Sequence, residues 1–295
     1  MHFPSPLIAA RFLRRRQRFL AEVELADGRR EWVHVPNSGA LTGCAQPGQD
    51  ILLTQDGRPG RKTAYTWRFT RGPAGWICID TLVPNRVVAE ALAAGGLPGI
   101  GGGGQGPVGP CPYKKLPQSP SPNPLRGEKW RVEPELSAPA QPAPSNRGLG
   151  GEFEGRVEEL HSPSPPLKVR AEVTLPQGSR LDFLVEVGGR RIYLEVKSVT
   201  WVEDRVALFP DGVTARGRRH LEDLAALVGQ GHQAWNIFVV QRGDARLFRP
   251  AAAVDPAYAR RLAWAVQEGV KILVLVEKVA PPEITLASNL PFDLT

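Results

Sequence analysis

Three charged residues in one short stretch have types and spacing suited to phosphoryl chemistry. Asp182 lies in a run of alternating apolar residues, and Glu195 and Lys197 lie two apart in the next run, after Gly188-Gly189. This pattern predicts a β-hairpin over residues 179–200. Residues two apart on a strand share a face, so Glu195 and Lys197 point the same way and a tight turn would bring Asp182 across from them. Two carboxylates and an amine are costly to hold on apolar strands, and a divalent metal bound by the carboxylates would explain them.

Glu172 extends the pattern to Glu…Asp…Glu-x-Lys, because it lies on the predicted strand 169–175 before the hairpin. Asp182 and Glu195 are the expected ligands of a Mg²⁺ or Mn²⁺ ion, with the main-chain carbonyl of Val196 as a further ligand. Such an ion activates water and neutralises charge during phosphodiester cleavage. Lys197 would orient or deprotonate that water, and Glu172 would bind a second metal or support the first. The competing interpretation is a surface ladder of cross-strand ion pairs.

Further polar residues follow the hairpin. Asp211 lies in a Phe-Pro-Asp-Gly turn, where a local structural role is favoured, although Asp211 could approach the site from this loop. Arg216 and Arg219 precede a predicted helix over 221–228, and helix N-termini bind phosphate readily. His220 could act as a general acid, but a packed or hydrogen-bonded histidine is the favoured interpretation.

The segment from Leu167 onward predicts an α/β sandwich with a mixed sheet. Continuous apolar runs at 234–240 and 270–276 are typical of strands buried on both faces. A helix is expected from Asp255-Pro256 to Val266, with Asp255 as its N-cap.

Residues 1–82 predict about five short strands and therefore a small OB-like β-barrel. A helix follows at 87–94. OB barrels often bind nucleic acid through aromatic and basic residues. The candidates for such contacts are Arg14, Arg15, Arg16, Arg18, Arg61, Lys62, Tyr65 and Trp67, with Arg180 beside the hairpin. In the alternative interpretation Trp67 belongs to the core and the arginines form a solvated edge. Residues 101–166 are rich in Gly, Pro and Ser and predict a flexible low-complexity insertion.

The composition agrees with an anionic partner. The chain has 295 residues and a formal net charge of +7, which favours an anionic partner, nucleic acid first; the alternative is an ordinary basic surface. The three cysteines show no CxxC spacing, which argues against a disulfide framework or a cysteine-bound zinc. With neither a secretory signal nor an apolar run long enough for a membrane span, we expect a cytoplasmic protein, and association with a bacterial or archaeal nucleoid is an open option. A sugar-metabolising enzyme has little support, because Rossmann and phosphate-loop motifs are missing.

The chain resembles the sugar fermentation stimulation protein A (SfsA) family in many separate stretches. The resemblance rests on segments such as HVPNSGAL (34–41), TLVPNRVVAEAL (81–92), YLEVKSVTW (193–201) and FPDGVTARGRRHLEDL (209–224). It implies an N-terminal OB-like barrel at 1–82 and a PD-(D/E)XK nuclease-like α/β domain at 83–295, an α+β protein overall. The insertion 101–166 is unusual for the family.

The family resemblance also bears on function. It implies DNA binding, and the nuclease pattern falls on Asp182, Glu195 and Lys197, with Leu181 in place of the usual proline. Asn37, in the segment 34–41, is a further candidate contact with nucleic acid. Two functions are therefore expected: a metal-dependent nuclease that acts on DNA, with RNA or single strands as open alternatives, or a non-catalytic DNA-binding regulator of sugar-utilisation genes.

Overall fold

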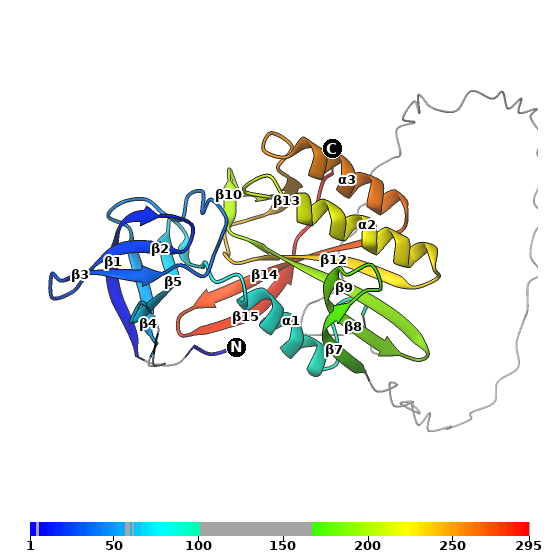
Figure 1. Ribbon diagram of the computed structural model, residues 1–295, viewed down its shortest axis with the longest axis horizontal. Helices are drawn as coiled ribbons and strands as arrows, with labels where there is room; N and C mark the ends of the chain where they lie inside the picture. Colours follow the sequence, from blue (N-terminus) through cyan, green and yellow to red (C-terminus); the bar gives the residue numbers. More distant parts are fainter. Residues whose placement is uncertain (4–5, 57–59, 61, 101–166, 295) are drawn as a thin grey trace, which may run out of the picture. The chain divides into compact units, whose positions relative to one another are not determined.

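The computed structural model describes residues 1–3, 6–56, 60, 62–100 and 167–294. The described residues form a barrel and a mixed sheet flanked by helices (Figure 1), which confirms the α+β class. The predicted insertion 101–166 lies outside these residues. No helix of the described chain is long and apolar enough to cross a membrane.

The N-terminal barrel is built from strands that pair in the order β3-β2-β1-β4-β5-β6. A parallel pairing of β3 with β5 at His34 and Thr66 closes the sheet on itself. Apolar side chains alternate inward along these strands, and Phe12 stacks on Trp67 in the core with 5.0 Å between ring centroids. The strands are β1 (Leu7–Arg16), β2 (Leu20–Leu25), β3 (Arg30–His34), β4 (Asp50–Gln55), β5 (Tyr65–Gly72) and β6 (Gly75–Cys78).

Strand β1 was not predicted. Arg14, Arg15 and Arg16 therefore lie on the first strand and do not precede it. The alternation of its core residues is interrupted by a bulge between Phe12 and Arg14, which hides the strand period in the sequence.

The C-terminal sheet has the strand order β15-β14-β12-β9-β8-β7. Strand β12 pairs in parallel with both β9 and β14, and the other pairings are antiparallel. Its strands are β7 (Lys168–Thr174), β8 (Arg180–Val187), β9 (Arg190–Val199), β12 (Gln233–Val240), β14 (Lys271–Ala280) and β15 (Glu283–Asn289).

Helices cover both faces of this sheet (Figure 1). Helix α1 (Val83–Ala93) packs on the face that carries Phe183 and Leu194. Helices α2 (Ala215–Gly229) and α3 (Pro256–Gln267) pack on the other face, beside Leu184 and Tyr193.

The predicted hairpin is confirmed as β8 and β9, which pair Phe183 with Leu194. Continuing this register places Asp182 opposite Glu195. Since Leu184 and Tyr193 face α2 and α3, the alternation puts Asp182, Glu195 and Lys197 on that face as well. The hairpin therefore presents the three charged side chains to the N-terminal end of α2.

One carboxylate organises the beginnings of α2 and α3. Asp255 caps α3 by accepting from the Tyr258 amide at 2.9 Å, and it accepts from the Thr214 amide at 2.8 Å. Thr214 in turn caps α2 by accepting from the Gly217 amide at 3.0 Å. Helix α2 thus begins six residues earlier than the predicted Leu221, because Thr214 supplies a cap that the apolar pattern did not reveal.

A small three-stranded sheet, β10-β11-β13, lies outside the predicted elements. It consists of β10 (Trp201–Glu203), β11 (Val206–Phe209) and β13 (Leu247–Pro250). Strand β11 leads directly into the turn that carries Asp211, so this sheet fixes where that turn begins.

The barrel and the C-terminal sheet share a hydrophobic core. Phe69 and Cys78 of the barrel belong to the same buried cluster as Leu275 and Ile284 of the sheet. The side-chain amide of Gln241 donates to the main-chain oxygen of Asp80 at 3.1 Å across this contact.

Candidate active site

Asp182 is oriented by two hydrogen bonds. Its Oδ2 accepts from the main-chain amide of Val196 at 2.7 Å, and its Oδ1 accepts from Nδ2 of Asn85 at 2.7 Å. Asn85 lies in the first turns of α1, so the helix on the opposite face reaches the edge of the hairpin. Sequence reasoning missed Asn85, because nothing in its local pattern connects it with a residue 97 positions away.

Glu195 is held on one oxygen and open on the other. Its Oε1 accepts from Nζ of Lys197 at 2.6 Å and is also hydrogen-bonded to Nδ1 of His220. Its Oε2 is buried and has no hydrogen-bond partner in the part of the chain that the structure describes. A buried carboxylate oxygen without a partner is costly, and a cation is the kind of ligand that would satisfy it.

A short chain of hydrogen bonds fixes the tautomer of His220. Nε of Arg216 donates to Nε2 of His220 at 3.3 Å, so that ring nitrogen is an acceptor. We therefore assign the ring proton to Nδ1, which donates to Glu195. Arg216 and His220 are one helical turn apart on α2, so their side chains lie on the same face of the helix and can contact each other. This supports the predicted hydrogen-bonded role of His220.

The two carboxylates have opposite electrostatic environments. Burial, followed by the nearby charge of Glu195, raises the pKa of Asp182. Burial would also raise the pKa of Glu195, but Lys197 and His220 outweigh it and lower that pKa. A neighbouring cation would relieve the repulsion that Asp182 experiences.

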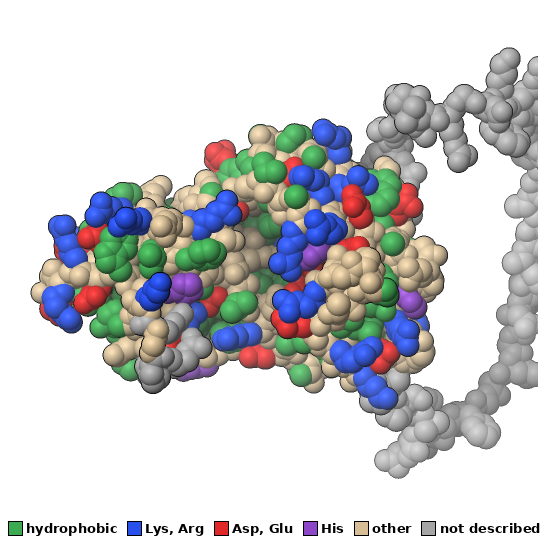
Figure 2. All heavy atoms as spheres, viewed as in Figure 1, with side chains coloured by type: hydrophobic (Ala, Val, Ile, Leu, Met, Phe, Trp, Pro, Cys, Tyr) green, Lys and Arg blue, Asp and Glu red, His purple; other side chains and the backbone are tan. Residues whose placement is uncertain are grey.

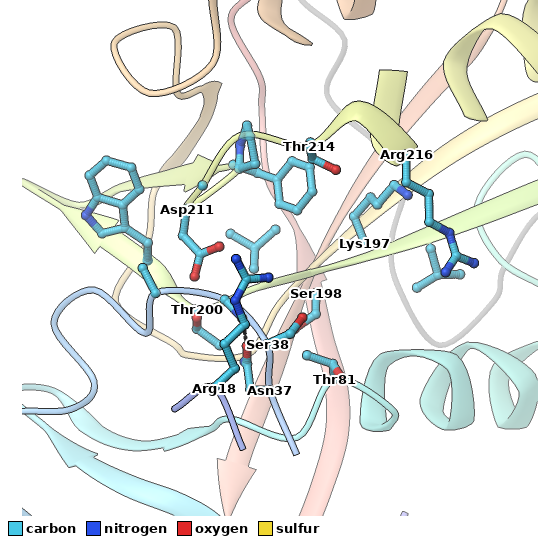
Figure 3. A pocket seen from close by; sticks show the side chains of 18 of the residues that line it. Arg18, Asn37, Ser38, Thr81, Lys197, Ser198, Thr200, Asp211, Thr214 and Arg216 are labelled. Atoms are coloured by element: carbon cyan, nitrogen blue, oxygen red, sulfur yellow. Dashed lines mark hydrogen bonds between the residues drawn. The ribbon is translucent and has the colours of Figure 1, made fainter. Parts of the chain in front are cut away.

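The charged cluster opens into a cavity of about 890 Å³. Its walls come from the C-terminal hairpin, from the loop before α2 and from loops of the barrel (Figure 3). Lys197 and Arg216 lie together in this view, and Asp211 lies across from Arg18. Figure 2 shows Lys and Arg side chains on both sides of a hollow in the protein surface. Such a lining favours an anionic ligand.

Hydrogen bonds within the barrel hold in place the loop that forms the barrel side of the cavity. Arg15 donates to the main-chain oxygens of Gly39 at 2.7 Å and Asn37 at 2.6 Å. Asn37 is buried, and its side chain donates to Ile79 and accepts from the Gly39 amide. Arg15 and Asn37 both line the cavity and also hold this loop in place, and their predicted contacts with nucleic acid stay predictions.

Asp211 connects the loop before α2 with a loop of the barrel, the two parts of the cavity wall. Its Oδ2 accepts from the main-chain amide of Leu41 at 3.2 Å. A Cβ atom added to Gly39 would lie 2.3 Å from that same oxygen, so only glycine allows this approach. Asp211 therefore does more than terminate a local turn.

Several predicted site residues lie elsewhere. Trp67 is completely buried and donates its indole N–H to the main-chain oxygen of Phe69, so the prediction that it contacts nucleic acid is wrong. Glu172 and Arg180 are exposed, pair with each other at 3.2 Å and do not line the cavity. This corrects the catalytic role predicted for Glu172, whereas the contact of Arg180 with nucleic acid stays a prediction. The positive φ of Glu172 (53°) removes it from the regular strand geometry opposite Asp182.

The remaining basic and aromatic candidates fall into two groups, those that line the cavity and those that do not. Arg18 and Arg216 line it. Contacts of the others with nucleic acid stay predictions, because these residues do not belong to its lining: Arg14, Arg16, Lys62, Tyr65 and Arg219. Arg61 lies outside the described residues.

The donor set fits a hard divalent cation. Asp182 and Glu195 supply carboxylate oxygens, and the open Oε2 of Glu195 is available. Within the described chain, no group of three or more His, Cys, Asp or Glu side chains is arranged to hold a metal ion. Two carboxylates are nevertheless enough for Mg²⁺, which keeps several waters when it binds to proteins.

Comparison with known proteins establishes the family. The family profile "SfsA N-terminal OB domain" matches residues 13–79, and "Sugar fermentation stimulation protein RE domain" matches residues 154–283. A sugar fermentation stimulation protein homolog of Citrifermentans bemidjiense is 34% identical over 291 residues, which cover 99% of each chain. A homolog of Thioalkalivibrio sulfidiphilus is 36% identical over 297 residues, which cover 100% of this chain and 99% of the relative. The chain belongs to the SfsA family.

A solved structure shows the same fold. The structure of Pyrococcus furiosus SfsA in complex with Ca²⁺ matches with a TM-score of 0.70 and covers 99% of this chain and 98% of that one. The two sequences are 22% identical, so the match speaks for the shared architecture of barrel and mixed sheet.

Proposed function

We propose that the protein is a metal-dependent nuclease that hydrolyses phosphodiester bonds in DNA. The observation that carries this proposal is the convergence of Asp182, Glu195 and Lys197 on one edge of a basic cavity. A surface ladder of ion pairs would leave these groups exposed, whereas the side chains of Lys197 and Glu195 are only 12% and 5% exposed. Buried charges arranged around an unsatisfied oxygen are typical of functional sites.

Each residue has a defined part in this proposal. Asp182 and Glu195 would hold Mg²⁺ or Mn²⁺, which supplies an activated water and neutralises charge on the phosphate. Pyrococcus furiosus SfsA was solved with Ca²⁺, a cation that takes the same oxygen ligands. The ammonium of Lys197 is placed to orient the attacking water or to stabilise developing negative charge. Arg216 can bind a phosphate through the guanidinium nitrogens that do not bond to His220.

Cleavage of 5′-labelled DNA with Mg²⁺ or Mn²⁺ tests the proposal. We expect Asp182→Asn and Lys197→Met each to lower the rate by a factor on the order of 10² or more, because each removes a charge from the reacting centre. Glu172→Gln is the matched control, since this exposed carboxylate is paired with Arg180 outside the cavity. Equal rates in all four proteins would contradict a catalytic role for the cluster.

A second candidate is a DNA-binding regulator without turnover. Its support is that Lys197 and His220 already satisfy one oxygen of Glu195 without an ion. This function predicts no cleavage with any divalent cation, together with DNA binding whose log K falls linearly with log salt.

A further inference from the structure

The cavity rim carries exposed apolar side chains that phosphate binding does not explain. Among the described residues, the large hydrophobic side chains with substantial exposure are Phe19, Leu82, Val169 and Val213. Leu82 is 59% exposed and Val213 is 75% exposed, and both line the cavity. Phe19 directly follows Arg18, another lining residue, and stacks on His34 with 6.5 Å between ring centroids. Leu82 and Val213 therefore place exposed apolar surface in the same cavity as the acid–lysine cluster.

These apolar groups approach the cavity from opposite sides. Leu82 precedes α1, the helix that supplies Asn85 to Asp182. Val213 precedes Thr214, the N-cap of α2, and therefore lies next to the helix that carries Arg216. Arg18 and Arg216 add cations to the lining of the same cavity (Figure 3).

This combination selects a particular form of nucleic acid. A duplex presents phosphates and sugars outward and keeps its base faces stacked inside, so it offers little apolar surface to Leu82 or Val213. An unpaired strand offers phosphates to the arginines and base faces to apolar side chains at once. A cavity of about 890 Å³ also has the size of pockets that enclose small molecules, about 300–1,000 Å³, and suits a short run of nucleotides.

We infer that the cavity binds a single-stranded segment of DNA, with Leu82 and Val213 contacting bases while Arg18 and Arg216 contact phosphates. The inference rests on the proposed function, because it places the phosphodiester of the bound strand next to Asp182 and Glu195. It adds a substrate class: DNA that is unpaired at the site of cleavage.

The test measures binding without cleavage. Fluorescence anisotropy in EDTA compares a labelled 12-nucleotide single strand with the 12-base-pair duplex of the same sequence. We expect the wild-type chain to bind the single strand more tightly. Leu82→Asn and Val213→Thr keep the number of side-chain heavy atoms and replace apolar with polar groups, and together they should weaken single-strand binding about 5- to 20-fold while duplex binding is unchanged.

The matched control is Val169→Thr, the same substitution at an exposed valine of β7 that does not line the cavity. It should leave both affinities unchanged. Arg18→Gln should reduce the salt dependence of single-strand binding by about 0.7 in the log–log slope, the value expected for one lost phosphate contact.

Two results would overturn the inference. One is a duplex that binds as tightly as the single strand, and the other is a double variant with unchanged single-strand affinity. Neither result depends on catalysis, since the assay contains no divalent cation. Conversely, an Asp182→Asn variant that keeps the single-strand preference but cleaves at the wild-type rate would refute the catalytic role proposed for Asp182 and leave the single-strand inference standing.

Discussion

At the scale of single residues, the two oxygens of Glu195 have different surroundings. Lys197 and His220 hold Oε1, while Oε2 has no partner among the described residues. Because Arg216 holds the far side of the His220 ring, the position of Glu195 depends on a residue that also faces the cavity. His220 is therefore a positioning residue in the proposed mechanism.

Substitutions at His220 should separate its two hydrogen bonds. His220→Ala removes both and should lower Mn²⁺ affinity about 10- to 100-fold, as is typical for groups that orient a metal ligand. His220→Asn can still donate to Glu195 but cannot accept from Arg216 in the same way, so an intermediate loss is expected. Calorimetric titration with Mn²⁺ measures this directly, and equal affinities in all three proteins would contradict the role.

The buried carboxyl group of Glu277 should make the stability of the protein depend on pH. It is completely buried, neither of its carboxylate oxygens has a partner, and burial raises its pKa to about 8 from an ordinary value of 4.5. Below pH 4.5 the group is protonated in both the folded and the unfolded chain. Between these values the unfolded chain releases the proton and the folded chain keeps it. The contribution of Glu277 to stability is therefore lost as the pH rises toward about 8.

Glu277→Gln should remove this pH dependence. Relative to the wild type, the variant should gain on the order of 1–3 kcal/mol at pH 8 and much less at pH 5. Thermal unfolding at the two pH values measures the difference, with the exposed Glu283→Gln on β15 as a control. A Gln variant whose difference from wild type is the same at both pH values would refute the assignment.

At the scale of elements, sequence patterns identified the strands and helices with strong periodicity. The hairpin, the buried strands β12 and β14 and the cap of α3 at Asp255 were predictable, because apolar runs and an Asp-Pro start are local signals. Strand β1, the small sheet around β11 and the early start of α2 were not. Their positions depend on a bulge, on short pairings and on a threonine cap that only the tertiary contacts make visible.

In the candidate site, too, some residues were predictable from local sequence and others depend on tertiary contacts. The triple of Asp182, Glu195 and Lys197 follows from strand periodicity and a two-residue turn. Asn85 and the orientation of His220 come from helices distant in sequence, and no local pattern contains them. For Glu172 the error has the opposite direction: strand periodicity predicted a site residue that the structure places outside the cavity. Periodicity cannot reveal a residue with positive φ.

Asp255 provides a test of how α2 is positioned. Besides its two main-chain contacts, it accepts from Arg218 at 3.1 and 2.9 Å. Asp255→Ala should therefore cost about 2–4 kcal/mol, more than the loss of one helix cap. Asp255→Asn keeps the capping oxygen and should cost less. Urea unfolding measures both values, and equal losses would indicate that the negative charge rather than the cap provides the stabilisation.

At the scale of the whole molecule, the shared core predicts that barrel and sheet unfold together. Phe69 is completely buried in the cluster that contains Leu275 and Ile284. Phe69→Ala should lower stability by about 3–5 kcal/mol because it leaves a cavity at this junction. Urea unfolding followed by tryptophan fluorescence and by circular dichroism should show one coincident transition. Two separated transitions in the wild type would show that the parts are independent.

Because loops of the barrel form part of the cavity wall, the protein is not freely modular. A hybrid that took its barrel from a relative would also need the loop around Gly39 to accommodate Asp211. Recombination that exchanged one half without matching the other would therefore reshape the entrance, even though every residue of the acid–lysine cluster stayed the same.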